Sequence, residues 1–340
     1  MKVCIVDPYW FNATDRSSYL GARSVFLEKY ADIIYFSDRN KFIKYAARFP
    51  RVVIRLISTK KIIFSSSLVN ETCDVALWFN GPIYNRGFSF EEIKVPKAVA
   101  LHDYNFYPDA ISELLKSNRV DFLIGHGYHD KYCDFFRAYY SSFIGRVLPF
   151  YFGFNSNIYN IDASIERRRS IVGLGAIAPI AGRLFSDDLR AYGNFFNDRL
   201  FSHELRAWFR AYKLEIDCFE SFFPEGGVYR DENINEKSLL QAYDFFVSDL
   251  GSLNFAPART FQGIGSGSIL IGENHRCYQD LGFDSTNSIL VDDISISKIH
   301  TLISRADISE LQRNSRLLAE NFTFERCAEA LHLSLVKALS

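Results

Sequence analysis

The chain has 340 residues, with 39 Lys and Arg against 40 Asp and Glu, which gives a formal net charge of −1 at pH 7. This length suffices for two domains that each bury a hydrophobic core. A net charge so close to zero excludes binding of nucleic acid through bulk electrostatics. The six cysteines are scattered without a Cys-x-x-Cys pair. That pattern is typical of a reduced intracellular protein and not of a disulfide framework or a zinc ribbon.

No apolar run in the sequence reaches the ~18–20 residues that cross a bilayer. The chain also enters its first apolar segment at Val3, which leaves no room for the charged and apolar regions of a signal peptide. We therefore expect a cytoplasmic protein, either freely soluble or associated with the inner face of the membrane.

The first half of the chain alternates short apolar segments with segments of helical spacing. Strands are predicted at 2–6, 33–36, 74–79, 98–101, 120–124 and 147–150, and helices at 19–30, 108–115 and 131–140. Strand, helix and strand in succession predict a parallel α/β sheet. The loop after the first strand lacks the G-x-G-x-x-G pattern, so it carries no fingerprint for NAD or FAD.

Two of these strands run directly into polar residues. Asn80 follows the strand at 74–79, and His102 and Asp103 follow the strand at 98–101. Ligands bind beyond the carboxyl ends of strands in open parallel sheets, so these side chains are candidates for a binding site. A histidine beside an aspartate can act as a base or hold substrate hydroxyls. The alternative is a turn in which Asp103 caps the following helix.

The segment from Arg39 to Lys61 is strongly basic. It contains eight Lys and Arg residues, and no acidic residue lies between Asp38 and Glu71. We expect a helix here, followed by a strand with basic flanks. The segment is either a solvated surface or a patch that attracts anionic lipid head groups or a phosphorylated acceptor. Nucleic-acid binding through it is disfavoured by the near-neutral overall charge.

Two histidines, His126 and His129, follow the strand at 120–124. A pair of histidines three residues apart, without further well-spaced ligands, is a weak pattern for zinc. We therefore expect no metal site at this position.

A polar, charged segment at 158–169 predicts the boundary between two domains. We expect an N-terminal domain at 1–157, a C-terminal domain at 158–322 and a closing helix at 323–340. Further strands are predicted at 170–174, 216–219, 245–248, 269–271 and 288–291, further helices at 198–214, 235–243, 257–264, 295–304, 309–321 and 323–339, and a loop at 273–284.

Two loops of the second half carry residues suited to a phosphorylated ligand. Gly175 follows the strand at 170–174 and allows close backbone approach, while Arg183 begins the next helix as either a phosphate ligand or a surface cation. The stretch Asn254–Gly272 places Pro257 and Arg259 at the start of a helix and ends in an apolar strand. A helix N-terminus that carries an arginine beside a sheet favours an anion.

These residues carry a resemblance to a known family. Arg259-Thr260-Phe261-Gln262, then Gly265-Ser266-Gly267, then Ile269-Leu270-Ile271 resemble the C-terminal domain of GT-B glycosyltransferases. The similarity is closest to the glycosyltransferase-4-like, CgeB-type branch with its "glycosyl transferases group 1" domain. Gly175 with Arg183 is similar to the loop and arginine that face the donor diphosphate in that family. The resemblance is clearest over residues 165–340.

The resemblance implies an α/β protein of GT-B fold, with two Rossmann-like domains facing across a cleft and a C-terminal helix that crosses back to the first domain. It implies metal-independent transfer of a sugar from a nucleotide-sugar donor to a glycan or glycolipid hydroxyl, as in polysaccharide biosynthesis, with no cofactor. The residues that it assigns to the donor are Gly175, Arg183, Tyr229, Asn254, Arg259, Thr260 and Gln262. On the acceptor side His102 and Asp103 would be catalytic and Asn80 would line the site.

The chain departs from that family at two positions. The family has paired glutamates at the places of Asn254 and Gln262, which are both amides here. An amide still donates to and accepts from sugar hydroxyls, but it loses the charge-assisted bonds of a carboxylate. Two alternatives stay open: a catalytically silent GT-B module that binds sugar nucleotide or glycan, and a sugar-nucleotide epimerase.

Overall fold

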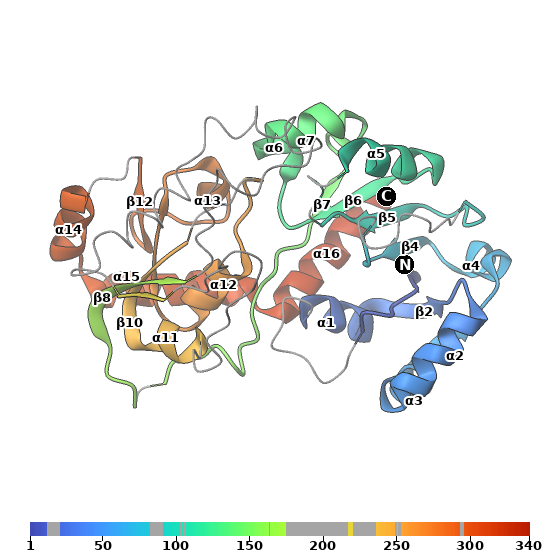
Figure 1. Ribbon diagram of the computed structural model, residues 1–340, viewed down its shortest axis with the longest axis horizontal. Coiled ribbons are helices and arrows are strands. Elements are labelled where there is room, and N and C mark those ends of the chain that lie inside the picture. Colours follow the sequence, from blue (N-terminus) through green and yellow to red (C-terminus); the bar gives the residue numbers. More distant parts are fainter. Residues whose placement is uncertain are drawn as a thin grey trace, which may run out of the picture. The chain divides into compact units, whose positions relative to one another are not determined.

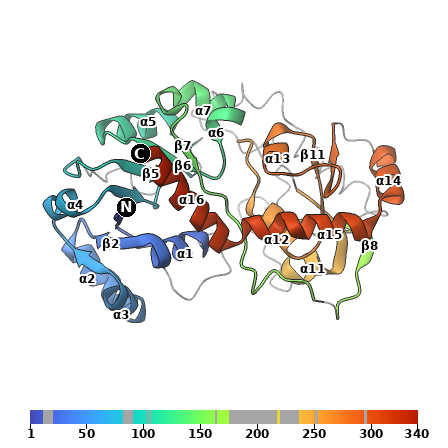
Figure 2. The same cartoon turned by 180° about the vertical axis from the view of Figure 1, so that it is seen from behind.

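The structure is a computed structural model that describes residues 1–11, 21–81, 91–102, 104, 107–162, 164–174, 217–219, 236–248, 250, 253–292 and 296–340. The chain divides into two compact units, one made of Met1–Tyr151 with Phe324–Ser340 and the other of Phe152–Thr323. Each unit has its own parallel sheet with helices packed on it (Figures 1 and 2). The predicted α/β class is therefore confirmed in both halves of the chain. The division falls after Tyr151, where the sequence predicts it after residue 157.

The sheet of the first unit has seven strands in the order β3-β2-β1-β4-β5-β6-β7, and all neighbours are parallel. The strands are β1 Val3–Val6, β2 Ala31–Tyr35, β3 Lys61–Ile63, β4 Val75–Trp78, β5 Lys97–Ala100, β6 Phe122–Gly125 and β7 Val147–Pro149. Every residue of β1, β4 and β5 is buried, as expected of a parallel sheet covered on both faces. The strand order reverses between β1 and β4, which is where such sheets bind ligands.

Helices cover this sheet, and one of them comes from the far end of the sequence. They are α1 Gly21–Tyr30, α2 Arg39–Arg48, α3 Pro50–Thr59, α4 Ser66–Thr72, α5 Pro108–Ser117, α6 His129–Tyr132, α7 Asp134–Tyr139 and α16 Phe324–Leu339. Helix α16 packs on α1: a Cβ at Gly21 would lie 2.0 Å from the Phe324 ring. The rings of Tyr30 and His332 also stack with their centroids 4.5 Å apart. The helix expected to cross back thus completes the first unit.

The prediction of one helix followed by a strand in the basic segment is wrong for its second part. Residues 50–59 form the helix α3, and only Lys61–Ile63 is a strand. The β-branched residues at 52–54 favour a strand. Pro50 opens the helix, where its missing N–H costs nothing, and Val52, Val53 and Leu56 bury one helical face. Burial of that face outweighs the local strand preference.

The sheet of the second unit has the order β12-β11-β10-β8-β9, again with parallel neighbours. The strands are β8 Arg168–Leu174, β9 Asp217–Phe219, β10 Tyr243–Val247, β11 Ile269–Glu273 and β12 Ser288–Val291. Its order reverses between β8 and β10, so the ligand position of this sheet lies at the ends of those two strands. Aliphatic side chains fill its core, among them Ile171, Ile269 and Ile271 around Phe245.

The described helices of the second unit are α11 Glu236–Ala242, α12 Ala258–Gly265, α13 Arg276–Asp280, α14 Ile296–Arg305 and α15 Ile308–Ala319. The predicted loop at 273–284 is wrong in part, because it contains α13. The His275 side chain caps that helix by accepting a hydrogen bond from the Cys277 amide at 3.1 Å. The predicted helix at 198–214 lies outside the described residues. No helix in the described part of the chain is long and apolar enough to cross a membrane.

Candidate functional site

Helix α12 begins beyond the carboxyl end of β10, at the point where the strand order of the second sheet reverses. Two glycines hold it there. A Cβ at Gly263 would lie 2.4 Å from the Phe246 ring, and one at Gly265 would lie 2.6 Å from the Phe154 ring. The helix therefore approaches the strand more closely than any larger residue at 263 allows. The predicted helix over 257–264 and strand over 269–271 are confirmed.

The turn after α12 is a Schellman motif. Gly267 has a φ of +81°, and the Ser268 amide donates to the Gly263 carbonyl at 3.1 Å. A glycine in this left-handed position ends the helix without a Cβ clash. The chain then turns directly into β11, so the Gly265-Ser266-Gly267 run fixes the helix between two neighbouring strands.

The predicted donor residues occupy different faces of α12. Arg259 and Gln262 are both half-buried, and their spacing of three places them on the same face. Thr260 is fully buried, and its hydroxyl lies 2.8 Å from the Ser248 hydroxyl at the end of β10. Arg259 and Gln262 thus share a half-buried face of α12, whereas Thr260 holds the loop to the helix.

Asn254 lies in the loop between β10 and α12 with a φ of +54° and 5% of its surface exposed. Asparagine tolerates this left-handed conformation better than most residues. The loop is also closed by the Phe255 amide, which donates to the Leu250 carbonyl at 3.1 Å. Asn254 therefore shapes the loop that leads into the N-terminus of α12.

The first unit gathers a buried guanidinium and two imidazoles at the carboxyl ends of β4, β5 and β6. Arg23, from α1, is 5% exposed, and its Nη1 donates to the Phe79 carbonyl at 3.1 Å. Its Nη2 contacts Nε2 of His102. The rings of His102 and His126 stack with centroids 4.7 Å apart, and Nδ1 of His102 lies 2.7 Å from Nε2 of His126.

This surrounding keeps both histidines neutral. Burial, the Arg23 charge and the neighbouring His126 hold the pKa of His102 well below its ordinary value. Burial and Arg23 lower the pKa of His126 in the same way. Nε2 of His102 faces the Arg23 guanidinium, which only donates, and Nδ1 faces Nε2 of His126. Both ring nitrogens of His102 are therefore engaged inside the protein.

The third histidine of this region has a structural role. His129 is 1% exposed, its Nε2 accepts from the His126 amide at 3.2 Å, and its Nδ1 lies 3.1 Å from the Tyr104 hydroxyl. Among the described residues, no group of three or more His, Cys, Asp or Glu side chains is arranged to hold a metal ion.

Asn80 connects two strand ends at the reversal point of the first sheet. Its amide nitrogen donates to the Asp7 carbonyl at 2.9 Å. Asp7 itself has a φ of +46°, and its carboxylate accepts from the amide and the hydroxyl of Ser37 at 2.9 and 2.5 Å. These bonds fix the loops after β1 and β4 to one another, and Asn80 is half-buried between them.

Four of the predicted site residues lie outside the described part of the chain: Asp103, Gly175, Arg183 and Tyr229. The sequence prediction missed Arg23 and did not pair His126 with His102. The signal for Arg23 was a charged residue within the otherwise small and apolar run Gly21–Leu27. The signal for the pair was that both histidines follow strands, which become adjacent only once the strand order is known.

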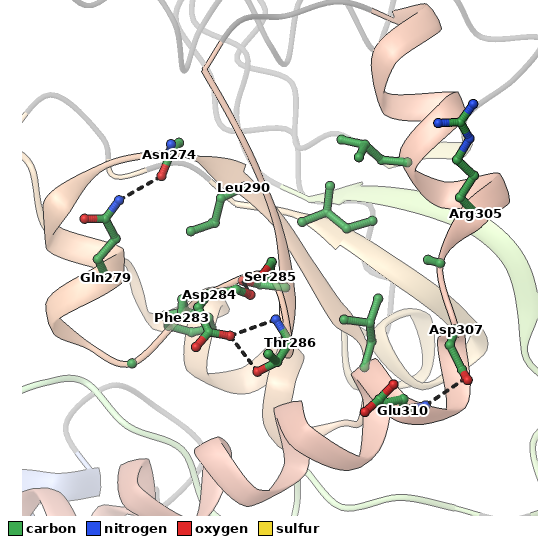
Figure 3. Close-up of a pocket in the computed structure, with 16 residues that line it drawn as sticks. Asn274, Gln279, Phe283, Asp284, Ser285, Thr286, Leu290, Arg305, Asp307 and Glu310 are labelled. Atoms are coloured by element: carbon green, nitrogen blue, oxygen red, sulfur yellow. Dashed lines mark hydrogen bonds between the residues drawn. The ribbon is translucent and has the colours of Figure 1, made fainter.

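A separate cavity of about 770 Å³ lies beside the edge strand β12 (Figure 3). Its polar residues bond mainly to one another: Gln279 donates to Asn274 at 2.9 Å, and the Thr286 hydroxyl donates to Asp284 at 2.6 Å. Its described lining includes no residue of the β10 exit loop or of α12. We therefore locate the candidate site by the carboxyl ends of the strands where the strand order reverses, and not by the size of a cavity.

Comparison with solved structures identifies the fold. The chain is similar to sucrose-phosphate synthase from Thermosynechococcus elongatus, with a TM-score of 0.54 and 11% identity over 99% of this chain and 100% of that one. It is similar to HepE from Anabaena in complex with UDP-glucose, with a TM-score of 0.52 and 13% identity over 99% and 100%. A third similar structure is AviGT4, a glycosyltransferase involved in avilamycin A biosynthesis, with a TM-score of 0.51 and 9% identity over 100% and 98%.

No family model and no curated protein sequence matches the chain. At these identities the similarity shows the fold, which is that of GT-B glycosyltransferases. The resemblance to the narrower CgeB-type branch stays a prediction.

Proposed function

We propose that this protein is a glycosyltransferase that moves a sugar from a nucleoside-diphosphate donor to a hydroxyl of a glycan or glycolipid. The observation that carries the proposal is the face of α12 that presents Arg259 and Gln262 at the reversal point of the second sheet. The GT-B fold supports it, as do the HepE structures that contain UDP and UDP-glucose.

The chemical demand of such a transfer is to stabilise the diphosphate that leaves with the nucleoside. In the proposal the negative charge of the diphosphate is stabilised by Arg259, by the first-turn amides of α12 and by the helix dipole. Arg183 is a second cation at this site. Gln262 holds ribose hydroxyls, Asn254 faces the sugar, and Gly175 and Tyr229 border the nucleotide. No metal or cofactor is part of the proposed mechanism.

On the acceptor side the proposal separates the roles of His102 and Asp103. Since both ring nitrogens of His102 have protein partners, we assign it the positioning of the loop after β5. The proton of the acceptor hydroxyl passes to Asp103, which follows His102 in the chain. Asn80 joins the neighbouring loop to the same edge of the sheet.

Substitution of Arg259 tests the donor site. Titration calorimetry with UDP, UDP-glucose and other nucleoside-diphosphate sugars should identify a ligand of the wild type, and Arg259→Ala should weaken it. Transfer or donor hydrolysis should fall by about 10²–10³-fold, the usual effect of removing one charge-stabilising donor. Arg276→Ala, which removes an exposed arginine of the same unit, is the matched control. No binding of any nucleoside diphosphate by the wild type would refute the proposal.

The pair of amides favours one alternative, a GT-B module that binds sugar nucleotide without turning it over. Tight donor binding with no transfer or hydrolysis above background would support that alternative. The other alternative is a sugar-nucleotide epimerase. Analysis of the nucleotide sugar after incubation without acceptor tests it, since an epimerised sugar would exclude a transferase.

A further inference from the structure

The basic segment 39–61 forms two adjacent helices at the edge of the first unit. We call residues 39–61 the basic helix pair; they comprise α2, α3, the residues Phe49 and Lys60 that follow these helices, and the first residue of the edge strand β3. The two helices lie next to each other, near β2, in both views of the molecule (Figures 1 and 2), and α3 also contacts β3. The sequence left open whether this segment is a solvated surface or a lipid-binding patch.

One face of the pair is fixed firmly to the unit. Val52, Val53 and Leu56 are buried, and the Tyr45 hydroxyl donates to the Phe11 carbonyl at 2.7 Å. The position of the pair is therefore set by packing on the sheet, and the opposite face is held toward the outside.

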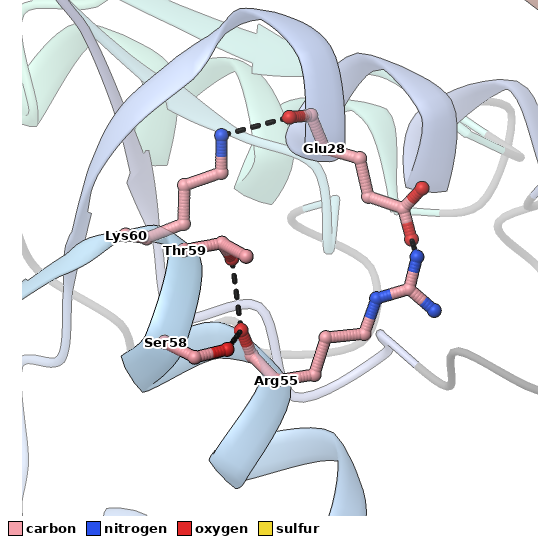
Figure 4. Close-up of polar contacts among 5 residues, drawn as sticks. All are labelled: Glu28, Arg55, Ser58, Thr59 and Lys60. Carbon is pink, nitrogen blue, oxygen red and sulfur yellow. Dashed lines mark hydrogen bonds and ion pairs between the residues drawn. The ribbon is translucent and has the colours of Figure 1, made fainter.

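Two of its eight cations help to fix it (Figure 4). Arg55 pairs with the Glu28 carboxylate of α1 at 2.7 Å. The Lys60 ammonium donates to the carbonyls of Glu28 and Ala31 at 2.8 and 2.6 Å. These two cations are therefore bonded to α1 and to the start of β2, although Arg55 is itself exposed.

The other six cations are exposed: Arg39, Lys41, Lys44, Arg48, Arg51 and Lys61. None of them forms an ion pair with an acid in the part of the chain that the structure describes. Two lie over aromatic rings of the same region, Arg39 over Phe64 at 5.3 Å and Arg48 over Phe49 at 5.2 Å. The surface thus carries a concentrated positive charge on a protein whose net charge is −1.

Exposed isoleucines are interleaved with these cations. Ile43 is 61% exposed, Ile54 67% and Ile57 57%. On α3 the spacing of three aligns Arg51, Ile54 and Ile57 along one side of the helix. On α2 the spacing of four places Ile43 in line with Arg39. Each helix therefore presents aliphatic side chains and cations together.

We propose that the basic helix pair docks the protein on an anionic lipid bilayer. The cations contact lipid phosphates, and Ile43, Ile54 and Ile57 enter the boundary between head groups and acyl chains. The combination of charge and aliphatic side chains selects this partner. A nucleic acid would satisfy the cations but would leave the isoleucines in water, and so would a protein surface that carries only acidic groups. The inference does not depend on the proposed transfer reaction.

The test is sedimentation of the full chain with vesicles of phosphatidylcholine, with and without phosphatidylglycerol. We expect binding only to the anionic vesicles, weakening as salt is added. The variant Lys41→Glu/Lys44→Glu/Arg51→Glu should lower the partition coefficient by about 100-fold or more. The control Lys116→Glu/Arg146→Glu/Arg276→Glu makes the same change of net charge at exposed sites elsewhere and should retain binding.

A second variant, Ile54→Ser/Ile57→Ser, leaves every charge in place and tests insertion. It should reduce binding to anionic vesicles, most clearly at high salt, where the attraction between charges is screened. Since these side chains are exposed, circular dichroism should show an unchanged fold. Equal loss in the control triple variant, or no effect of either helix-pair variant, would overturn the proposal. A labelled oligonucleotide serves as a second probe. A helix-pair variant that loses binding to this oligonucleotide but still binds anionic vesicles would also overturn the proposal.

Discussion

The guanidinium of Arg23 contacts the imidazole of His102 inside the first unit, so a permanent positive charge is buried against an imidazole whose pKa is held well below its ordinary value. The contact joins α1 to the loop after β5, and the Phe79 carbonyl joins the same guanidinium to β4. It ties the stability of the first unit to the protonation of its histidines.

The first prediction concerns pH. The folded pKa of His102 lies well below its ordinary value because of burial, Arg23 and His126, so below about pH 6.5 the unfolded state binds more protons than the folded state. Stability from this group is complete above that pH and is lost as the pH falls, by about 1.4 kcal/mol per pH unit. Urea unfolding, followed by tryptophan fluorescence between pH 5 and 8, measures the slope, and His102→Gln should reduce it. An equal slope in both proteins would contradict the assignment.

The second prediction isolates the contribution of Arg23. In Arg23→Met the positive charge is gone, so the pKa values of His102 and His126 should both rise toward the ordinary value. Nuclear magnetic resonance of the imidazole protons during a pH titration reads this directly. Lys29→Met removes an exposed cation from the same helix and should leave both titrations in place. Unshifted histidines in Arg23→Met would show that burial alone sets their pKa.

The third prediction concerns the approach of α12 to β10. Alanine is intrinsically better than glycine in a helix, so propensity alone predicts that Gly263→Ala stabilises the protein. Its Cβ would instead lie 2.4 Å from the Phe246 ring, so we expect a loss of about 1–3 kcal/mol and weaker nucleotide binding. Thermal unfolding of both proteins decides between the two. A higher melting temperature in the variant would contradict the close packing.

The fourth prediction is a double-mutant cycle at the base of the donor loop. Thr260→Val and Ser248→Ala each leave one buried hydroxyl without the partner it has at 2.8 Å, at a cost of about 1–3 kcal/mol. The double variant removes both hydroxyls and should cost less than the sum of the two single variants. Additive losses in denaturant unfolding would show that the two hydroxyls do not depend on each other.

Local sequence patterns predicted the parts of the fold that local chemistry determines. Pro257, the glycines at 265 and 267 and the apolar run at 269–271 specify a helix, its end and a strand, and the structure has all three. The β-branched run at 52–54 was misleading, because the burial of Val52 and Val53 on one face of a helix depends on residues distant in the chain. Pattern alone does not distinguish a short buried strand from one face of a helix.

The site was less predictable than the fold. His102 and Asn80 were singled out because they follow strands, and the structure places both at the expected edge of the sheet. Their hydrogen-bond partners, Arg23 and Asp7, come from segments more than 70 residues away in the chain. Partners at such separations are determined by strand order, which the pattern of a single sequence does not contain.

The packing of Phe324 against Gly21 has a consequence for how the protein is made. The ribosome completes all seven strands of the first sheet early, yet the helix that covers α1 is translated after the entire second unit. The first unit therefore cannot be completed until the whole second unit has been translated. Until then the apolar face of α1 that receives α16 is open to water and to chaperones. A fragment that stops at Tyr151 should expose the same face permanently.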